Sequence, residues 1–241
     1  MRFNRKFVHN FGRYFQKTKT EDLINNKNCS EFEVNNWIIS NFIIKKLVPV
    51  VGIKPYPLSE QLLMVATLCR FHPTHIFEWG TNIGKSARIF YETSKYFQIH
   101  SNIHSIDLPE EVDHIEHPHK KRAKLLKNIH EINLYQGDGL DISLEICEKI
   151  THGNILFFLD GDHDYNSVKR ELDGILSTIK FPVILVHDTF YQSSNSHYNI
   201  GPYLAIKDIL NMNKTQIKTL SMNTGLPGMT LLYHEINLKI E

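Results

Sequence analysis

Apolar residues recur along the chain in two patterns, and the alternation of these patterns predicts its elements. From residue 75 onward, short continuous apolar runs are separated by segments whose apolar residues recur every three or four positions. The short runs indicate buried strands, and the longer pattern indicates amphipathic helices. The expected strands are 75–79, 102–107, 132–136, 155–160, 182–188, 217–221 and 229–235. The expected helices are 31–47, 59–71 with Ser59 as its cap, 85–97, 119–129, 140–150, 165–179 and 201–212.

Strands that alternate with helices predict an α/β fold with a doubly wound, mostly parallel sheet covered on both faces. The last two strands are separated only by "NTGLPG". This linker is too short for a crossover helix, so these strands should pair antiparallel at the C-terminal end of a seven-stranded sheet. We expect residues 1–55 to form a helical N-terminal extension and residues 56–241 to form the main domain.

Composition narrows the class of protein. The chain has 241 residues, is 41% hydrophobic and has a formal net charge of +1, which suits one substantial core and gives no field that attracts nucleic acid. Cys29, Cys69 and Cys147 form no C-x-x-C pair, which argues against a disulfide framework and a structural zinc site. A reducing, cytoplasmic location is expected. No apolar stretch is long enough for a membrane span or a secretory signal.

The first twenty residues carry a separate pattern. Phe3, Phe7, Phe11 and Phe15 fall four apart among lysines and arginines, and no acid precedes Glu21. At helical spacing this gives an aromatic stripe flanked by cations. Such a helix could pack on its own domain or on a second subunit in a homo-oligomer, lie peripherally on a membrane surface, or act as an organelle-targeting segment.

The turn after the first strand contains candidate ligand-binding residues. "FEWGTNIGKS" places Glu78, Gly80 and Gly84 in an E-x-G-x-x-x-G pattern between a strand and a helix. Gly80 permits a sharp turn and close approach of a ligand, while Gly84 permits tight helix packing. The patterns G-x-G-x-x-G and G-x-x-x-x-G-K-[ST] are both absent. Because Glu78 would repel a pyrophosphate, a ligand that bears an ammonium group fits this turn better.

The next two strands also end in acids. Asp107 is placed to accept hydrogen bonds from both ribose hydroxyls of a nucleoside, or to cap a helix that begins at "DLPEE". Asp138, in "YQGDGLD", could receive an adenine amino group or cap the following helix. Both interpretations remain open for each residue.

Acids and histidines gather after the fourth and fifth strands. Asp160 ends one strand and Asp188 ends its expected neighbour, so the two carboxylates should converge, since adjacent strands lie about 5 Å apart. A hard divalent cation would relieve their repulsion. His187 and Thr189 are candidate further ligands, and His163 lies on the same edge together with Asp162.

A calcium loop is the structural competitor for the segment "DGDHDYNSVKRE". Asp160, Asp162, Asp164 and Glu171 match four of its ligand positions, but Tyr165 stands where glycine is required and a strand precedes the loop. For Asp164, the simpler interpretation is that it is solvated or caps the helix that begins at residue 165. For Asp162, this interpretation and a role in the site are equally supported.

Five segments in order, "FEWGTNIGKSA", "SIDL", "GDGLDI", "FLDGDHDYNSVKREL" and "VHDTF", resemble the class I S-adenosylmethionine-dependent methyltransferases. The similarity covers about residues 57–234 and is greatest to the branch with D-G-D-H-x-Y and H-D motifs, related to catechol-type and sugar or macrolide O-methyltransferases. It implies the Rossmann-like methyltransferase fold for residues 56–241. The cofactor-binding residues that it implies, with Asp107 at the ribose and Asp138 near the adenine, are Glu78, Gly80, Thr81, Gly84, Ser86, Asp107, Asp138 and Asp160.

The resemblance also implies a magnesium site and a base. In metal-dependent members, the positions of Asp160, Asp188 and the next residue bind magnesium, but that residue is commonly Asn in catechol-type enzymes and is Thr189 here. The general-base lysine of those enzymes falls at about His163, and His187 is the alternative base. A metal would lower the pKa of the acceptor hydroxyl, and a histidine would take its proton.

The expected activity is therefore transfer of a methyl group from S-adenosylmethionine to a hydroxyl, EC 2.1.1.-. We expect residues 109–120, residues 191–201 and the N-terminal helices to line the acceptor pocket. These segments are polar and rich in histidine, which favours a sugar-type small molecule or glycan. The alternatives are a metal-dependent hydrolase that uses the same acids and a non-catalytic binding or scaffold protein of this fold.

Overall fold

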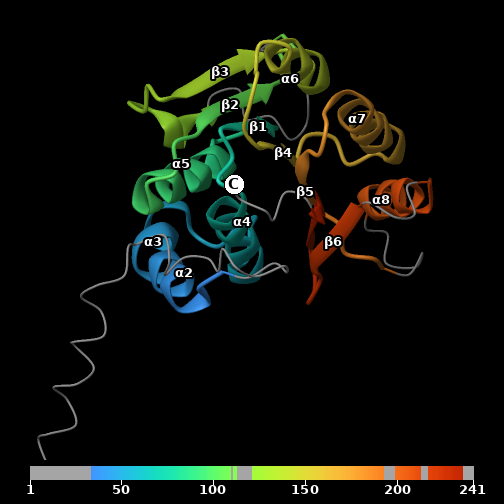
Figure 1. Cartoon of the computed structure of the whole chain (residues 1–241). Helices are drawn as coiled ribbons and strands as arrows, with labels where there is room; N and C mark the ends of the chain where they lie inside the picture. The colour runs from blue at the N-terminus through green and yellow to red at the C-terminus, as the bar shows by residue number, and fades with distance from the viewer. Residues whose placement is uncertain (1–33, 110, 113–120, 193–198, 213–216, 236–241) are drawn as a thin grey trace, which may run out of the picture.

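The chain folds around one seven-stranded sheet, seen in the computed structural model in Figure 1. The structure describes residues 34–109, 111–112, 121–192, 199–212 and 217–235. The strand order is β3-β2-β1-β4-β5-β7-β6, and only β7 runs antiparallel to its neighbours β5 and β6 within the described chain. The strands are β1 (His75–Trp79), β2 (Asn102–Asp107), β3 (Ile132–Gln136), β4 (Ile155–Leu159), β5 (Val183–His187), β6 (Ile217–Met222) and β7 (Met229–His234).

Helices cover both faces of this sheet (Figure 1). Successive strand residues point to opposite faces, so Ile76 lies in the core beneath α4 and α5, while Phe77 lies in the core beneath α6, α7 and α8. Both faces are therefore packed, which explains the continuous apolar runs of the central strands. The helices are α4 (Leu58–Phe71), α5 (Lys85–Phe97), α6 (Gly139–Cys147), α7 (Tyr165–Thr178) and α8 (Gly201–Met212).

The described part of the N-terminal extension is helical and shares the main core. It comprises α2 (Asn36–Phe42), the π-helical turn η1 (Ile43–Leu47) and α3 (Val48–Val51). The side chain of Asn35 caps α2 by accepting from the amide of Ile38 at 3.2 Å. Buried residues of α2, η1 and α3 pack in one cluster with α4, α5 and the sheet, so this part has no separate core.

Two expected features are wrong. The helix preceding β1 begins at Leu58 with Pro57 at its N-cap, so Ser59 lies inside the first turn and does not cap it. In the expected helix 119–129, the described residues form only the 3-10 turn η3 (Lys124–Leu126). Leu126 is buried, and Ala123 and Ile129 pack partly against the same core, so the segment is held by tertiary contacts without forming a helix. The aromatic and basic segment 1–20 lies outside the described residues.

The topology fixes where a ligand binds. The strand order reverses between β1 and β4, which lie side by side at the centre of the sheet. Ligands of doubly wound sheets bind beyond the carboxyl ends of strands at such a switch point. The ends of β1, β2, β4 and β5 carry the predicted site residues. Among the described helices, none is both long and apolar enough to cross a membrane. Cys69 and Cys147 are buried cysteines.

We expect the central strands to contribute most of the stability. Phe157 on β4 is fully buried and contacts Phe77 and Trp79, so Phe157→Ala should lower the free energy of unfolding by about 3–5 kcal/mol. Leu134→Ala on β3, where the side chain is 55% exposed, should change it by less than about 0.5 kcal/mol. Urea unfolding followed by circular dichroism measures both, and equal effects would contradict this packing.

Candidate active site

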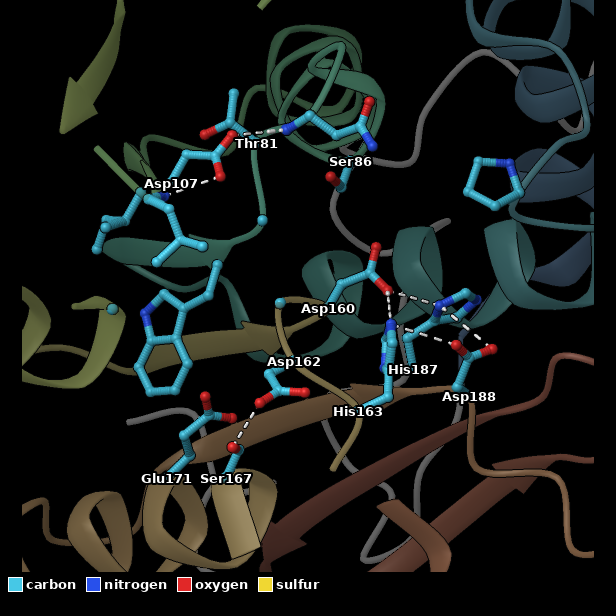
Figure 2. A pocket seen from close by; sticks show the side chains of 18 of the residues that line it. Thr81, Ser86, Asp107, Asp160, Asp162, His163, Ser167, Glu171, His187 and Asp188 are labelled. Atoms are coloured by element: carbon cyan, nitrogen blue, oxygen red, sulfur yellow. Dashed lines mark hydrogen bonds and ion pairs between the residues drawn. The ribbon is translucent and has the colours of Figure 1, made fainter. Parts of the chain in front are cut away.

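A cavity with a volume of about 1370 Å³ lies beyond the carboxyl ends of β1, β2, β4 and β5. Figure 2 shows Thr81 and Asp107 at one end, His163, His187 and Asp188 at the other, and Asp160 between them. The sequence-predicted residues that line this cavity are Gly80, Thr81, Ser86, Asp107, Asp138, Asp160, Asp162, His163, Asp164, Glu171, His187 and Asp188.

Gly80 makes the central turn of the cavity possible. Its φ of 95° lies in the region that favours glycine, and a Cβ there would collide with the backbone carbonyl oxygen of Asp160. Gly84 also has a positive φ and starts α5, where a Cβ would meet the side chain of Leu126. Gly84 thus serves packing beneath the cavity, whereas Gly80 forms part of its wall.

Glu78 lies beneath the cavity and does not line it. It is fully buried, and its carboxylate accepts hydrogen bonds from the hydroxyls of Ser86 and Ser105. The hydroxyl of Ser105 also lies 2.6 Å from that of Thr81. Burial raises the pKa of Glu78 to about 8, against the lowering effect of these hydrogen bonds. Glu78 therefore positions Ser86 and Thr81, which do reach the cavity.

Asp107 ends β2 with an oriented carboxylate. It accepts from the backbone amides of Asn82 at 3.1 Å and Leu108 at 2.9 Å, and the guanidinium Nε of Arg122 lies 3.3 Å from its Oδ2. The side chain is almost completely buried. These contacts hold its oxygens at the mouth of the β1–α5 turn, where a cofactor hydroxyl could reach them.

The acids around the start of α6 and α7 are helix caps. Asp138 accepts from the amide of Asp141 at 3.0 Å and pairs with Arg170, so its carboxylate caps α6 while it lines the cavity. Asp164 caps α7 through the amide of Asn166. Asp162 accepts from the hydroxyl of Ser167 at 2.5 Å. The capping interpretation is therefore confirmed for Asp138 and Asp164.

His187 is held between two carboxylates. Its Nδ1 lies 2.6 Å from Oδ1 of Asp160, and its Nε2 lies 3.1 Å from Oε2 of Glu60 on α4. Burial alone would lower the pKa of His187, but the Asp160 charge and the hydrogen bonds to both carboxylates raise it to about 10. Contact of both ring nitrogens with carboxylates favours the doubly protonated, cationic ring. This form has no lone pair for a general base, so the arrangement favours His163 over His187 in that role.

A second histidine–acid pair faces the cavity. Nε2 of His163 lies 3.3 Å from Oδ2 of Asp188 and 4.0 Å from Oδ1 of Asp160. Asp188 follows β5 with a φ of 56°, an unusual conformation for a residue other than glycine and one typical of functional sites. The phenol of Tyr56 donates a short hydrogen bond to Oδ2 of Asp160.

The residues present do not fit the expected three-ligand magnesium site. Thr189 is 1% exposed, and its hydroxyl lies 2.8 Å from that of Thr230 on β7 rather than facing the cavity. Both carboxylate oxygens of Asp160 already accept hydrogen bonds, from His187 and Tyr56. Throughout the described ranges, no group of three or more His, Cys, Asp or Glu side chains has the arrangement of a metal site.

Sequence reasoning missed several residues that line or support the cavity. Tyr56 and Glu60 come from the segment before β1, which contains no recognisable motif. The one available signal is that Glu60 is the first acidic residue after Glu33. Glu171 was considered only as part of a calcium loop, yet it lines the cavity from α7. Burial raises its pKa to about 8 despite the charge of Arg170.

Comparison with known proteins places the fold. No protein-family model matches the chain, and no curated protein matches it by sequence. Among solved structures, the S-adenosylhomocysteine-bound methyltransferase PaMTH1 of Podospora anserina is 15% identical, with a TM-score of 0.53 over 97% of both chains. The O-methyltransferase TomG of Streptomyces achromogenes, solved with S-adenosylmethionine, is 14% identical, with a TM-score of 0.54 over 96% of both.

A third structure is CalS11, the TDP-rhamnose 3′-O-methyltransferase of calicheamicin biosynthesis. It is 14% identical, with a TM-score of 0.51 over 81% of this chain and 91% of CalS11. At these identities the likeness establishes the architecture. The chain has the Rossmann-like fold of the class I methyltransferases, with the seven-stranded sheet and antiparallel β7 expected from the sequence.

The paired His187 should make stability depend on pH. Its pKa of about 10 in the folded state exceeds 6.5, so the native state binds the extra proton between these values. The free energy of unfolding should therefore fall as pH rises from 8 to 10, by up to about 1.4 kcal/mol per pH unit. This range lies above the pKa of Glu78 and Glu171, which limits their contribution.

Urea unfolding of His187→Gln at several pH values checks this expectation. The variant should be less stable than the wild type near neutral pH, and its stability should decline less between pH 8 and 10. His130→Gln, at an exposed position, serves as the matched control and should keep the wild-type slope. Parallel slopes for all three proteins would show that His187 is not held as a cation.

Proposed function

We propose that this protein is an S-adenosylmethionine-dependent O-methyltransferase, EC 2.1.1.-. The observation that carries the proposal is the division of one cavity into two chemically different ends. One end has a glycine turn and the oriented carboxylate of Asp107, and the other has the His163–Asp188 pair. Methyl transfer needs both a pocket for the adenosyl cofactor and a group that accepts the proton of the acceptor hydroxyl.

The cofactor would extend across the first end of the cavity. Thr81 and Ser86 beside Gly80 would hold its methionine part, and Asp107 would accept from the ribose hydroxyls. The adenine would lie toward Trp79, which lines the cavity on that side together with the segment that begins α6. Carboxylates at the cavity also favour a ligand that carries an ammonium and a sulfonium charge.

His163 is the proposed general base. Nε2 of His163 lies 3.3 Å from Oδ2 of Asp188. In the tautomer that donates Nε2–H to this carboxylate, Nδ1 keeps the lone pair that would take the acceptor proton. Asp160 would contribute at the junction between cofactor and acceptor, where its charge is compensated by His187. His187 therefore stabilises the acidic cluster and does not move a proton. S-adenosylmethionine supplies the electrophilic methyl group when it is bound.

Magnesium has no step in this proposal. Asp160 and Asp188 are the two residues that could contact such an ion, but Thr189 faces β7 and the charge of Asp160 is already compensated by a histidine. Activity is therefore expected to persist in EDTA.

A sugar-type hydroxyl is the proposed acceptor, on a small molecule or a glycan. Polar groups of Lys54, Tyr56 and Asn199 line the acceptor end, and Leu226 and Pro227 add a small apolar wall. This mixture suits a hydroxylated ring better than a flat, fully apolar one. The similar fold of CalS11, whose name gives a nucleotide-linked rhamnose as its substrate, supports the same class.

The experiment that tests the function has two readouts. Calorimetry should detect S-adenosylmethionine binding, and a screen of glycan and phenolic acceptors should detect methyl transfer. We expect His163→Gln to lower the rate by about 10²–10⁴-fold with unchanged cofactor affinity, because it removes the base but not the cofactor pocket. Asp107→Asn should weaken cofactor binding.

His152→Gln, at an exposed position outside the cavity, is the matched control and should behave as the wild type. Hydrolysis by a protein that binds no cofactor would support the hydrolase alternative. A folded protein with neither binding nor activity would support the scaffold alternative. Loss of activity in EDTA, restored by magnesium, would contradict the metal-independent mechanism.

We expect Glu171, which lines the cavity from α7, to give cofactor binding a pH dependence. With a pKa of about 8, its carboxyl is largely protonated at pH 7 and would be able to donate a hydrogen bond to the cofactor. Affinity for S-adenosylmethionine should therefore fall as pH rises through 8. Glu171→Gln keeps a donor and should flatten this dependence, whereas Glu171→Ala should weaken binding by about tenfold at pH 7. Calorimetry across pH 6.5–9 measures the effect, and identical profiles for wild type and Glu171→Gln would contradict it.

A further inference from the structure

An unusually apolar surface lies on α2 and η1, on the side of these helices that faces away from the core. Trp37 is 89% exposed and Ile44 is 62% exposed. They are seven residues apart in one continuous helical segment, which places them on the same side about two turns apart. Ile39 and Phe42 on the other side are buried, so this segment presents apolar residues to both the core and the solvent.

This surface is also basic. Lys45 and Lys46 follow Ile44 in the sequence and are exposed, and the sequence contains no acidic residue between Glu33 and Glu60. Residues 37 and 44–46 are called the α2–η1 surface below.

The N-terminal part of the sequence has a positive excess. Residues 1–20 contain six lysines and arginines and no acid, but residues 21–33, which lead directly to the α2–η1 surface, contain four acids and one lysine. Residues 1–46 together have nine lysines and arginines against four acids, a formal charge of +5, whereas the whole chain has a formal net charge of +1. A partner for the α2–η1 surface must therefore be negatively charged and must also offer an apolar phase for an indole and a branched aliphatic side chain.

We propose that the α2–η1 surface binds the interface of an anionic lipid bilayer. Tryptophan is favoured at the level of the lipid head groups, the aliphatic side chain of Ile44 would enter the acyl boundary, and the two lysines would approach anionic head groups. This binding is peripheral and does not depend on the proposed catalytic function.

The α2–η1 surface is also close in sequence to residues that line the cavity. Seven residues separate Lys46 from Lys54, which lines the cavity together with Tyr56. Val50 and Ile53 between them are 39% and 53% exposed, so the apolar character of the exposed chain continues toward the cavity.

Tryptophan fluorescence of the full chain tests the proposal directly. The protein has two tryptophans, and Trp79 is 3% exposed, so a change of polarity outside the molecule reports on Trp37. We expect a blue shift of the emission with phosphatidylcholine vesicles that contain phosphatidylglycerol, little shift with phosphatidylcholine alone, and reversal at high salt. Trp37→Phe should abolish the shift and still sediment with the anionic vesicles.

A sedimentation assay with matched variants completes the test. The double variant Trp37→Ser/Ile44→Ser should lower the vesicle partition coefficient on the order of tenfold, because it removes the buried apolar contacts. Leu134→Ser/Met212→Ser, at positions 55% and 70% exposed on β3 and α8, should leave it unchanged.

Three results would overturn the proposal. Equal vesicle binding by wild type and the Trp37→Ser/Ile44→Ser variant would assign any binding to other residues. Absence of a blue shift with anionic vesicles would show that Trp37 does not enter the bilayer. A dimer in solution that the double variant converts to a monomer, without vesicle binding by the wild type, would make this surface an interface between two copies of the chain.

Discussion

The site depends on the compensation of buried acids at one end of the sheet. Asp160, Asp188 and Glu60 converge there in surroundings that exclude most water, and uncompensated carboxylates at such positions are costly. The ring of His187 meets this constraint by contacting both Asp160 and Glu60. Glu60 also accepts from the amide of Gly228 at 2.8 Å, so this one charge network joins α4, β4, β5 and the turn before β7. Packing of α4 on the sheet and assembly of the site are therefore coupled.

This network also distinguishes His163 from His187, which the sequence alone leaves as equal candidates for the base. His187 ends a buried strand and is enclosed by acids on both sides, so its proton is held tightly. His163 lies in the loop after β4, is 21% exposed and contacts Asp188 through one nitrogen. A base must exchange its proton with a substrate, and a structural cation must retain it. Burial and the number of acidic partners thus distinguish the two side chains where the motifs D-G-D-H and H-D do not, and this difference supports the proposal of His163 as the base.

Much of the fold follows from local pattern, and the exceptions have physical causes. The strands 75–79, 102–107 and 132–136 were predicted to the residue, because each is a short run of strand-forming residues bounded by glycine, proline or polar residues. The expected helix 119–129 failed in its described part because the cavity and the turn beneath it hold that segment instead. Arg122 reaches Asp107, and Leu126 packs on Gly84. Tertiary contacts there outweigh helix propensity.

The site residues that follow adjacent strands were predictable from the sequence. Those that come from a distant part of the sequence were not. Asp160, His187 and Asp188 follow neighbouring strands, so their approach follows from sheet order alone. Tyr56 and Glu60 reach the same point from a segment about 100 residues earlier, and no periodicity encodes such a contact. The side chain of Thr189 faces away from the cavity for a local reason. The left-handed conformation of Asp188 turns the backbone at the strand end, so the next side chain meets Thr230 on β7. One backbone conformation thus decides which oxygen atoms face the cavity, and a sequence motif that specifies residue type alone does not contain that information.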